Sequence, residues 1–191
     1  MLSPRMETLL KEVQALSPMP DDETLIDLPV PREDHPLEKL GQVFDQLKEE
    51  VQTSYPLEVV SALLEVFGVG DGMEFYPHIA HLIEAYPHPA ESYPLIQHAT
   101  TSANPGTRRW ACYLLGRRRQ REDEAFLVAR IHDEVAAVRE AALVGLIQLS
   151  QRYPMDHLVS LVEPLTRDED WGVQITARDA VEMLKASSEK N

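Results

Sequence analysis

The chain has 191 residues, of which 43% are hydrophobic and 26% are charged, and its formal net charge at pH 7 is −14. A single cysteine excludes a disulfide framework, and only eight glycines leave little room for the tight turns of a β-barrel. No stretch approaches the roughly 18 consecutive apolar residues of a membrane-spanning helix. We therefore expect one compact unit or a short repeat array in the cytoplasm, without membrane insertion.

The negative charge is unevenly distributed along the chain. Residues 1–107 carry 5 Lys and Arg against 18 Asp and Glu, whereas residues 108–191 carry 13 against 14. An acidic surface repels the phosphate backbone of nucleic acids and attracts basic partners. The alternative interpretation is that the charge only keeps a small protein soluble.

The first elements in chain order are an amphipathic helix and a connector. Residues 1–16 place Met6, Leu9, Leu10 and Val13 on one helical face. Residues 17–36 are rich in proline and acidic residues, which predicts an extended connector. We expect residues 1–36 to cap a helical repeat domain over residues 37–191.

A repeat begins after this connector. Apolar or small residues recur at offsets 0, 3, 4, 7, 8 and 11, which is one face of a helix, and the copies start at Leu40, Phe75, Thr107, Val138 and Val173. Further apolar residues at offsets 20, 21 and 24 predict a second helix in register. The pattern predicts helix pairs near 40–67, 75–102, 107–133 and 138–167, with a single helix near 172–186 whose polar Asp179, Glu182 and Lys185 face water.

Tyrosine precedes proline at five places, and these steps predict helix boundaries. Proline fits the first turn of a helix and disfavours helical geometry in the residue before it. We expect each tyrosine to wedge between neighbouring helices; the five are Tyr55, Tyr76, Tyr86, Tyr93 and Tyr153.

The segments NPGTRRWACYLLGRR and EVAAVREAALVGLIQL resemble HEAT-like repeats. The first helix of such a repeat reads Val-Arg, Ala-Ala and Leu-Gly after an acidic turn, as in Val138-Arg139 with Ala141-Ala142. The resemblance implies an all-α fold, a short right-handed α-solenoid that binds other proteins. The small size and acidity are also similar to bacterial HEAT-repeat immunity proteins, which are partners of secreted toxins.

Candidates for chemistry are few, and we predict no catalytic residues, no metal and no cofactor. Glu74, His78 and His81 are spaced closely enough on a helix to share a metal ion, but the repeat register predicts that His78 is packed and that His81 is exposed. Cys112 lies inside a predicted helix, which favours an inert, buried thiol.

One basic cluster stands out, formed by Arg108, Arg109, Arg117, Arg118, Arg119 and Arg121. Some HEAT-like folds are DNA glycosylases that hold DNA in a basic groove, so the cluster is a possible phosphate site. The favoured alternative is pairing of the arginines with neighbouring acidic turns, because a nucleic-acid binder usually spreads its positive charge over several repeats. We predict no binding of nucleic acid.

The leading hypothesis for function is a protein-binding module for a basic partner, such as a toxin domain that this chain neutralises. Enzymes or enzyme accessories of the DNA glycosylase or bilin-lyase type, and a structural adaptor, remain as alternatives. In the fold that the sequence resembles, the second helices line the concave side, so we expect contacts there and in the adjacent turns. The candidate contacts that lie off the apolar offsets of the second helices are Glu91, His98, Glu124, Asp156 and Ser160. The adjacent inter-repeat turn adds Asp168, Asp170 and Trp171, the last as an aromatic anchor or, alternatively, packed beneath the last helix.

Overall fold

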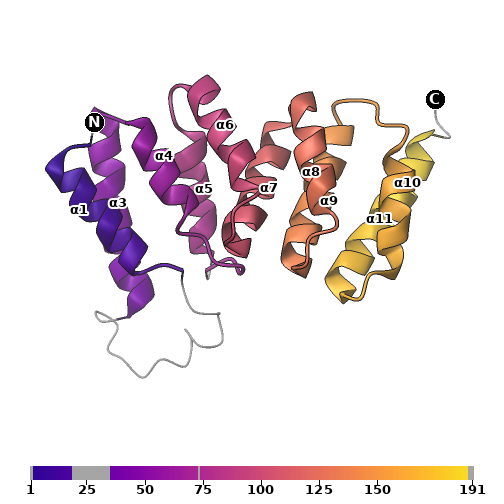
Figure 1. Cartoon of the computed structure of the whole chain (residues 1–191), viewed down its shortest axis with the longest axis horizontal. Coiled ribbons are helices and arrows are strands. Elements are labelled where there is room, and N and C mark those ends of the chain that lie inside the picture. Colours follow the sequence, from indigo (N-terminus) through magenta and orange to yellow (C-terminus); the bar gives the residue numbers. More distant parts are fainter. Residues whose placement is uncertain (1, 19–34, 73, 189–191) are drawn as a thin grey trace. The chain divides into compact units, whose positions relative to one another are not determined.

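The computed structural model describes residues 2–18, 35–72 and 74–188, and every regular element in these ranges is helical (Figure 1). The chain forms two compact units, residues 1–107 and 108–191. Within these described ranges, no helix is long and apolar enough to cross a membrane. The predicted all-α fold with HEAT-like helix pairs is confirmed. Most of the predicted connector, residues 17–36, lies outside the described residues, so the division after residue 36 stays a prediction.

The first unit contains a capping helix and two helix pairs. Helix α1 (Pro4–Ala15) packs on α3 (Pro36–Thr53) and α4 (Leu57–Leu64), and these are followed by α5 (Phe75–Glu84) and α6 (Pro89–Ala99). Helix α1 begins because the Ser3 hydroxyl accepts the Met6 N–H at 3.1 Å and proline occupies its first position. It buries the predicted stripe, which is Met6, Leu9, Leu10 and Val13.

Helix α5 corrects the predicted register by one residue. Its buried side chains are Tyr76, Ile79, Ala80 and Ile83, so the buried stripe starts at Tyr76 instead of Phe75. A shift of one residue rotates the buried face by 100°. His78 is therefore exposed, and the prediction that it is packed is wrong.

The Tyr-Pro steps mark helix boundaries at Tyr55, Tyr86 and Tyr153, and Pro77 lies in the first turn of α5. The Tyr55 hydroxyl donates to the Leu82 carbonyl at 2.7 Å, as expected for a tyrosine wedged between helices. The prediction is wrong at Tyr93, because Pro94 lies inside α6. Proline at this position has no N–H for the helical hydrogen bond, and the neighbouring turns of α6 continue regardless.

Helix α7 (Pro105–Arg118) starts in the first unit, where it is fastened to the end of α4. The Thr107 hydroxyl donates to the Leu64 carbonyl at 2.9 Å, and the Asn104 amide donates to the Phe67 carbonyl at 3.1 Å. Gly106 lies so close to the backbone of residues 67 and 68 that a Cβ atom there would clash. The glycine is therefore required by close approach.

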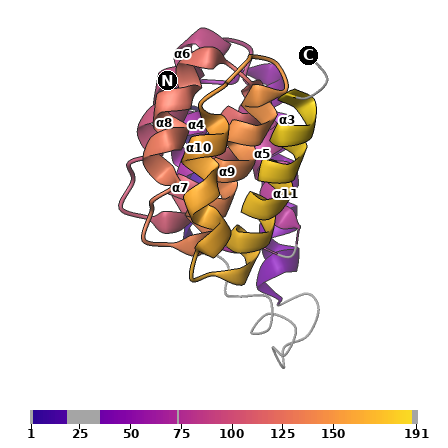
Figure 2. The ribbon, with the colours of Figure 1, turned by 90° about the vertical axis from the view of Figure 1, so that its right-hand side faces the viewer.

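Among its described residues, the second unit contains residues 108–118 of α7 and four further helices. Its other helices are α8 (Glu124–Arg130), α9 (Ala136–Ser150), α10 (Leu158–Val162) and α11 (Trp171–Ser188), with 3-10 turns at Arg121–Asp123 and Glu163–Arg167. Helices α9, α10 and α11 lie side by side (Figure 2). The predicted stripe of α9 is buried at Val138, Ala142, Gly145, Leu146 and Leu149, and Ala141 is half-buried.

Candidate functional site

Two buried Arg–Asp pairs organise the turns of the second unit. Arg108 donates to both oxygens of Asp133, from Nε at 2.9 Å and from Nη2 at 2.8 Å. Arg139 repeats this arrangement with Asp168 and also donates to the Asp133 carbonyl at 2.9 Å. These pairs tie each first helix to the turn that precedes the next first helix. Arg108 and Asp168 are therefore structural residues, and Asp168 is removed from the predicted contacts.

The ionisation of these groups follows from their contacts. Burial acts to raise the pKa of Asp168, but the hydrogen bond from Arg139, the N–H of Asp170 and the charge of Arg139 together lower it. The pKa of Asp133 is lowered in the same way. Burial acts to raise it, but the hydrogen bonds from Arg108 and the Val135 N–H, together with the charges of nearby arginines, outweigh that effect. Both carboxylates are held in the charged form that pairs with arginine.

The second helices of this unit, α8 and α10, carry the candidate contact surface. Here Glu124 Oε1 and His157 Nε2 lie 2.7 Å apart, and the Ser160 hydroxyl donates to the His157 carbonyl at 2.7 Å. Asp156 is exposed beside His157. An open depression joins these helices and includes apolar side chains; it is lined by Arg121, Glu122, Glu124, Ala125, Val128, His157 and Leu161. The structure therefore brings Glu124 into contact with His157, next to exposed Asp156 and Ser160. We call the surface formed by the lining of this depression, Asp156 and Ser160 the α8–α10 face.

The two candidates in the first unit lie on its second helix, α6. Glu91 and His98 are both exposed, and the Tyr86 hydroxyl donates to Glu91 Oε2 at 3.0 Å. Their separation of seven residues places them on the same side of the helix, two turns apart.

Trp171 is 74% exposed at the start of α11. The alternative that it packs beneath the last helix is therefore wrong. Helix α11 is buried through Val173, Ala177, Ala180 and Val181, and Trp171 precedes this stripe. Asp170 is half-buried and caps the helix, because its Oδ1 accepts the Val173 N–H at 3.0 Å.

The arginine cluster separates into different environments. The predicted intramolecular pairing is confirmed for Arg108, but among the described residues neither Arg119 nor Arg121 forms an ion pair.

Cys112 is fully buried, and burial raises the pKa of its thiol to about 12, as expected for an inert side chain. No group of three His, Cys, Asp or Glu side chains in the described ranges is placed to hold a metal ion.

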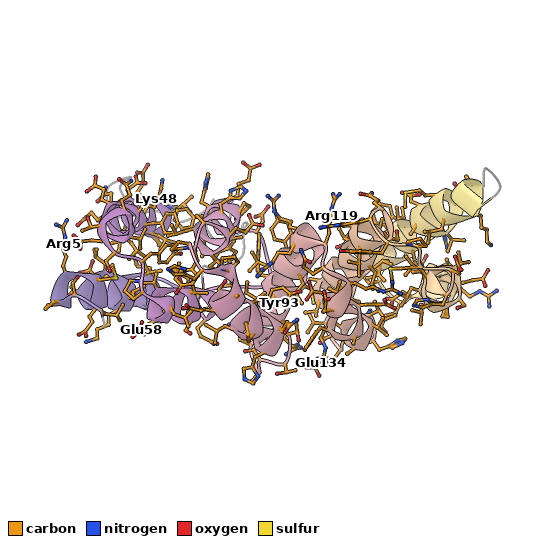
Figure 3. All side chains as sticks on the ribbon, turned by 90° about the horizontal axis from the view of Figure 1, so that it is seen from above. Arg5, Lys48, Glu58, Tyr93, Arg119 and Glu134 are labelled. Atoms are coloured by element: carbon orange, nitrogen blue, oxygen red, sulfur yellow. The ribbon has the colours of Figure 1, made fainter. Side chains whose placement is uncertain are left out.

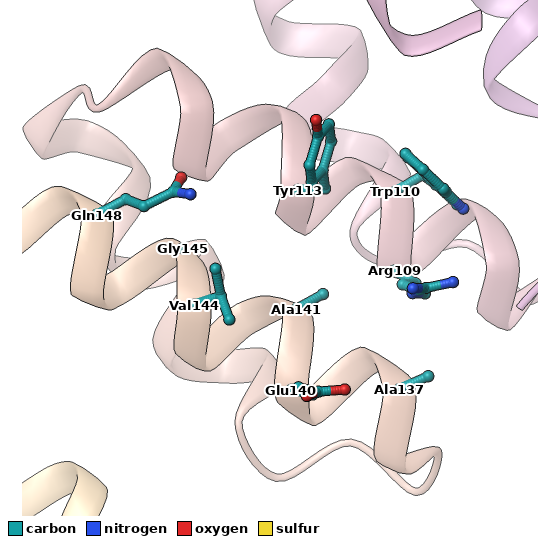
Figure 4. A pocket seen from close by; sticks show the side chains of 9 residues that line it. All are labelled: Arg109, Trp110, Tyr113, Ala137, Glu140, Ala141, Val144, Gly145 and Gln148. Carbon is teal, nitrogen blue, oxygen red and sulfur yellow. The ribbon is translucent and has the colours of Figure 1, made fainter. Parts of the chain in front are cut away.

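Sequence reasoning missed a hollow of about 240 Å³ between the first helices α7 and α9 (Figure 4). Arg109 and Tyr113 line its α7 side, and Ala137, Ala141 and Val144 line its α9 side. Small residues at positions 137 and 141, opposite an aromatic residue, are the sequence signal that points to such a space. The repeat pattern assigned Ala141 to the buried stripe, whereas its side chain is half-buried and lines this hollow.

Comparison with known proteins supports the repeat assignment. Residues 92–182 match the family model of HEAT repeats. The match runs from within α6 to within α11 and contains both segments in which the resemblance was found. HEAT repeats generally mediate protein–protein interaction, and proteins of this family are generally non-enzymatic scaffolds. No match was found among curated proteins.

Proposed function

We propose that this chain is a protein-binding module that captures a basic partner through its second helices. The observation that carries the proposal is the α8–α10 face, where Glu124 and His157 line an open depression together with half-buried Val128 and Leu161. Asp156 and Ser160 are exposed and lie close to His157 in the chain. Apolar contact at the centre with a polar rim is the usual anatomy of a protein interface.

Charge supports a basic partner. The first 107 residues carry 18 acidic against 5 basic side chains, and Glu91 on α6 extends the acidic character to a second helix of that unit. Such a field accelerates the approach of a positively charged protein. In its most specific form the proposal is that the partner is a basic toxin domain, such as a nuclease, and that this chain masks it. An adaptor in a larger complex uses the same contacts without inhibiting anything.

Affinity capture with identification of the bound protein tests the proposal. A double variant, Glu124→Lys with Asp156→Lys, reverses charge on the α8–α10 face and is expected to abolish recovery of the partner. Asp179→Lys with Glu182→Lys makes the same charge change at two exposed positions of α11 and is the matched control. Equal recovery with all three proteins contradicts the assigned face. Loss of the captured protein's activity on binding distinguishes an inhibitor from an adaptor.

Trp171 is the proposed aromatic anchor. Because its side chain is exposed, Trp171→Ala is expected to leave the melting temperature unchanged while weakening capture by roughly 2 kcal/mol. Met183→Ala, which shortens another exposed apolar side chain of α11, is expected to leave capture unchanged. A melting temperature that falls together with capture assigns Trp171 to packing and removes it from the interface.

A further inference from the structure

The outer face of α7 and α9 carries a basic strip in a chain that is otherwise acidic. Arg109, Tyr113 and Arg117 follow one another at intervals of four residues along α7, so they share one side of the helix. Gln148 lines the hollow on α9, and Arg152 lies four residues beyond it. We call Arg109, Arg117, Arg119 and Arg152 the basic strip.

Aromatic rings and backbone hold these arginines in place. The guanidinium of Arg109 lies 5.4 Å from the centre of the Trp110 ring, and that of Arg117 lies 5.7 Å from the centre of the Tyr113 ring. Arg152 donates to the Arg119 carbonyl at 3.4 Å, which joins the ends of α7 and α9. Side chains positioned in this way lose less conformational entropy when they bind a ligand.

Arg119 adopts a backbone conformation that favours glycine. Its φ is +51°, and the left-handed region costs a non-glycine residue about 1–2 kcal/mol. Its side chain is exposed and makes no ion pair within the described ranges. Figure 3 shows Arg119 on the opposite side of the second unit from Glu134, whose carboxylate lies near Arg108. The arginine at this position is therefore not explained by packing or by an internal ion pair.

The hollow at one end of the strip is shaped by two glycines. A Cβ atom on Gly116 would lie 2.7 Å from the Gly145 Cα, so α7 and α9 touch there. Toward Arg109 the helices leave space above Ala137 and Ala141, as Figure 4 shows. At about 240 Å³ the space accommodates one large apolar side chain.

We propose that the basic strip and this hollow bind an acidic linear segment of another protein. One bulky apolar side chain of the segment enters the hollow, and carboxylates on either side pair with Arg109 and with the group at Arg117, Arg119 and Arg152. Eight helical residues rise about 12 Å, which an extended peptide spans in about four residues. The segment therefore carries its acidic residues about four positions apart, with the apolar residue between them.

An acidic protein segment fits this surface better than nucleic acid does. The apolar wall at Ala137, Ala141 and Val144 favours an aliphatic side chain and offers nothing to a phosphate. The strip thus extends the proposed function with a second surface of opposite charge to the α8–α10 face.

Fluorescence anisotropy with the full chain tests the proposal, using the labelled peptide Asp-Glu-Leu-Ser-Asp-Glu-Glu at about 50 mM salt, where charge pairs are weakly screened. We expect saturable binding that weakens about tenfold when the peptide leucine is replaced by serine. Ala141→Leu, which fills the hollow, is expected to weaken the leucine peptide about fivefold and to leave the serine peptide unchanged. Equal binding of both peptides to the original protein overturns the assignment of the hollow.

Charge reversal supplies the second arm. Arg117→Glu with Arg119→Glu is expected to weaken binding of the peptide at least tenfold. Arg178→Glu with Lys185→Glu, at exposed positions of α11, makes the same charge change and is expected to alter binding less than twofold. Thermal melts confirm that each variant is folded. Three results would each overturn the proposal. The first is an equal effect of the α7 and α11 charge reversals, and the second is displacement of the peptide by duplex DNA at matched charge concentration. The third is self-association of the chain that Arg117→Glu with Arg119→Glu abolishes. The α8–α10 variants are expected to leave peptide binding unchanged, so failure of this proposal is distinguishable from failure of the proposed function, on which it rests.

Discussion

At the scale of single residues, the buried Arg139–Asp168 pair makes the sharpest stability prediction. Asp168→Asn keeps the shape of the side chain but removes the carboxylate that pairs with Arg139. The Arg139 side chain is only 8% exposed, so water cannot replace this partner. Removing one partner of a buried pair costs about 3 kcal/mol or more. Glu169→Gln is the matched control, because Glu169 lies 3.6 Å from the same guanidinium but is 87% exposed. Urea unfolding should show a large loss for the first variant and almost none for the second; similar losses would contradict the structural role of Asp168.

The same pairs predict how stability depends on pH. Asp133 and Asp168 have pKa values lowered by folding, so they bind protons more readily in the unfolded chain. Their contribution is complete above the unfolded pKa of about 3.9 and is lost as pH falls through the lower, folded values. Urea midpoints measured from pH 7 to pH 2.5 should therefore fall steeply below about pH 4, and less steeply for Asp168→Asn. Parallel curves for the two proteins would show that Asp168 does not supply the dependence.

Sequence reasoning at this scale succeeded where burial follows periodicity. The stripe of α1 and most of the stripe of α9 were predicted residue by residue. It failed for Asp168, because acidic residues in a turn are usually exposed to solvent. The sequence does not show that Arg139, 29 residues earlier, pairs with this carboxylate. The predicted pairing with acidic turns holds for Arg108, which follows the repeat start Thr107 as Arg139 follows Val138. Within the described residues it does not hold for Arg119, which lies beyond the end of α7.

At the scale of helices, two glycines predict opposite effects of the same substitution. A Cβ atom at Gly106 would clash with the backbone of residues 67 and 68, so Gly106→Ala should separate the start of α7 from α4 and cost about 2 kcal/mol or more. Gly41 lies inside α3, and a Cβ atom added there would meet no neighbouring atom within 4 Å, so Gly41→Ala should stabilise the chain by about 0.5–1 kcal/mol. Thermal melts of the two variants should shift in opposite directions. A gain for Gly106→Ala would contradict the close approach.

The helix pairs were predictable because each first helix buries one continuous stripe. The limits of this reasoning are clear in α5 and α6. In α5 the buried face is rotated by one residue, since Phe75 and Tyr76 are both bulky and apolar and the period alone does not choose between them. In α6, Pro94 follows a tyrosine as at the true boundaries, but the helix had already started at Pro89, which occupies the favoured first position.

At the scale of the whole molecule, charge distinguishes the surfaces. The sequence showed that the acidity lies in residues 1–107, and the structure shows that the nearly neutral remainder still has a basic strip on its first helices and acidic residues on the α8–α10 face. Composition did not reveal this arrangement, because opposite charges on different faces cancel in any sum over sequence.

The acidic field predicts that capture of the basic partner depends on salt. Association should slow as salt rises from about 0.05 to 0.5 M, because screening shortens the range over which the acidic residues attract the partner. Dissociation should change much less. Stopped-flow or surface-based kinetics with the captured partner provide the test, and association rates that do not change with salt would remove the electrostatic argument for a basic target.

Hydrogen exchange of the chain, with and without its captured partner, tests the central claim most directly. Amide protection on binding reports which helices the partner covers, without any substitution that changes the fold. We expect new protection in α8, in α10 and in the turn that contains Asp156, and little change in the outer amides of α7 and α9. Protection confined to α7 and α9, or no protection in α8 and α10, would contradict a protein-binding module that acts through its second helices.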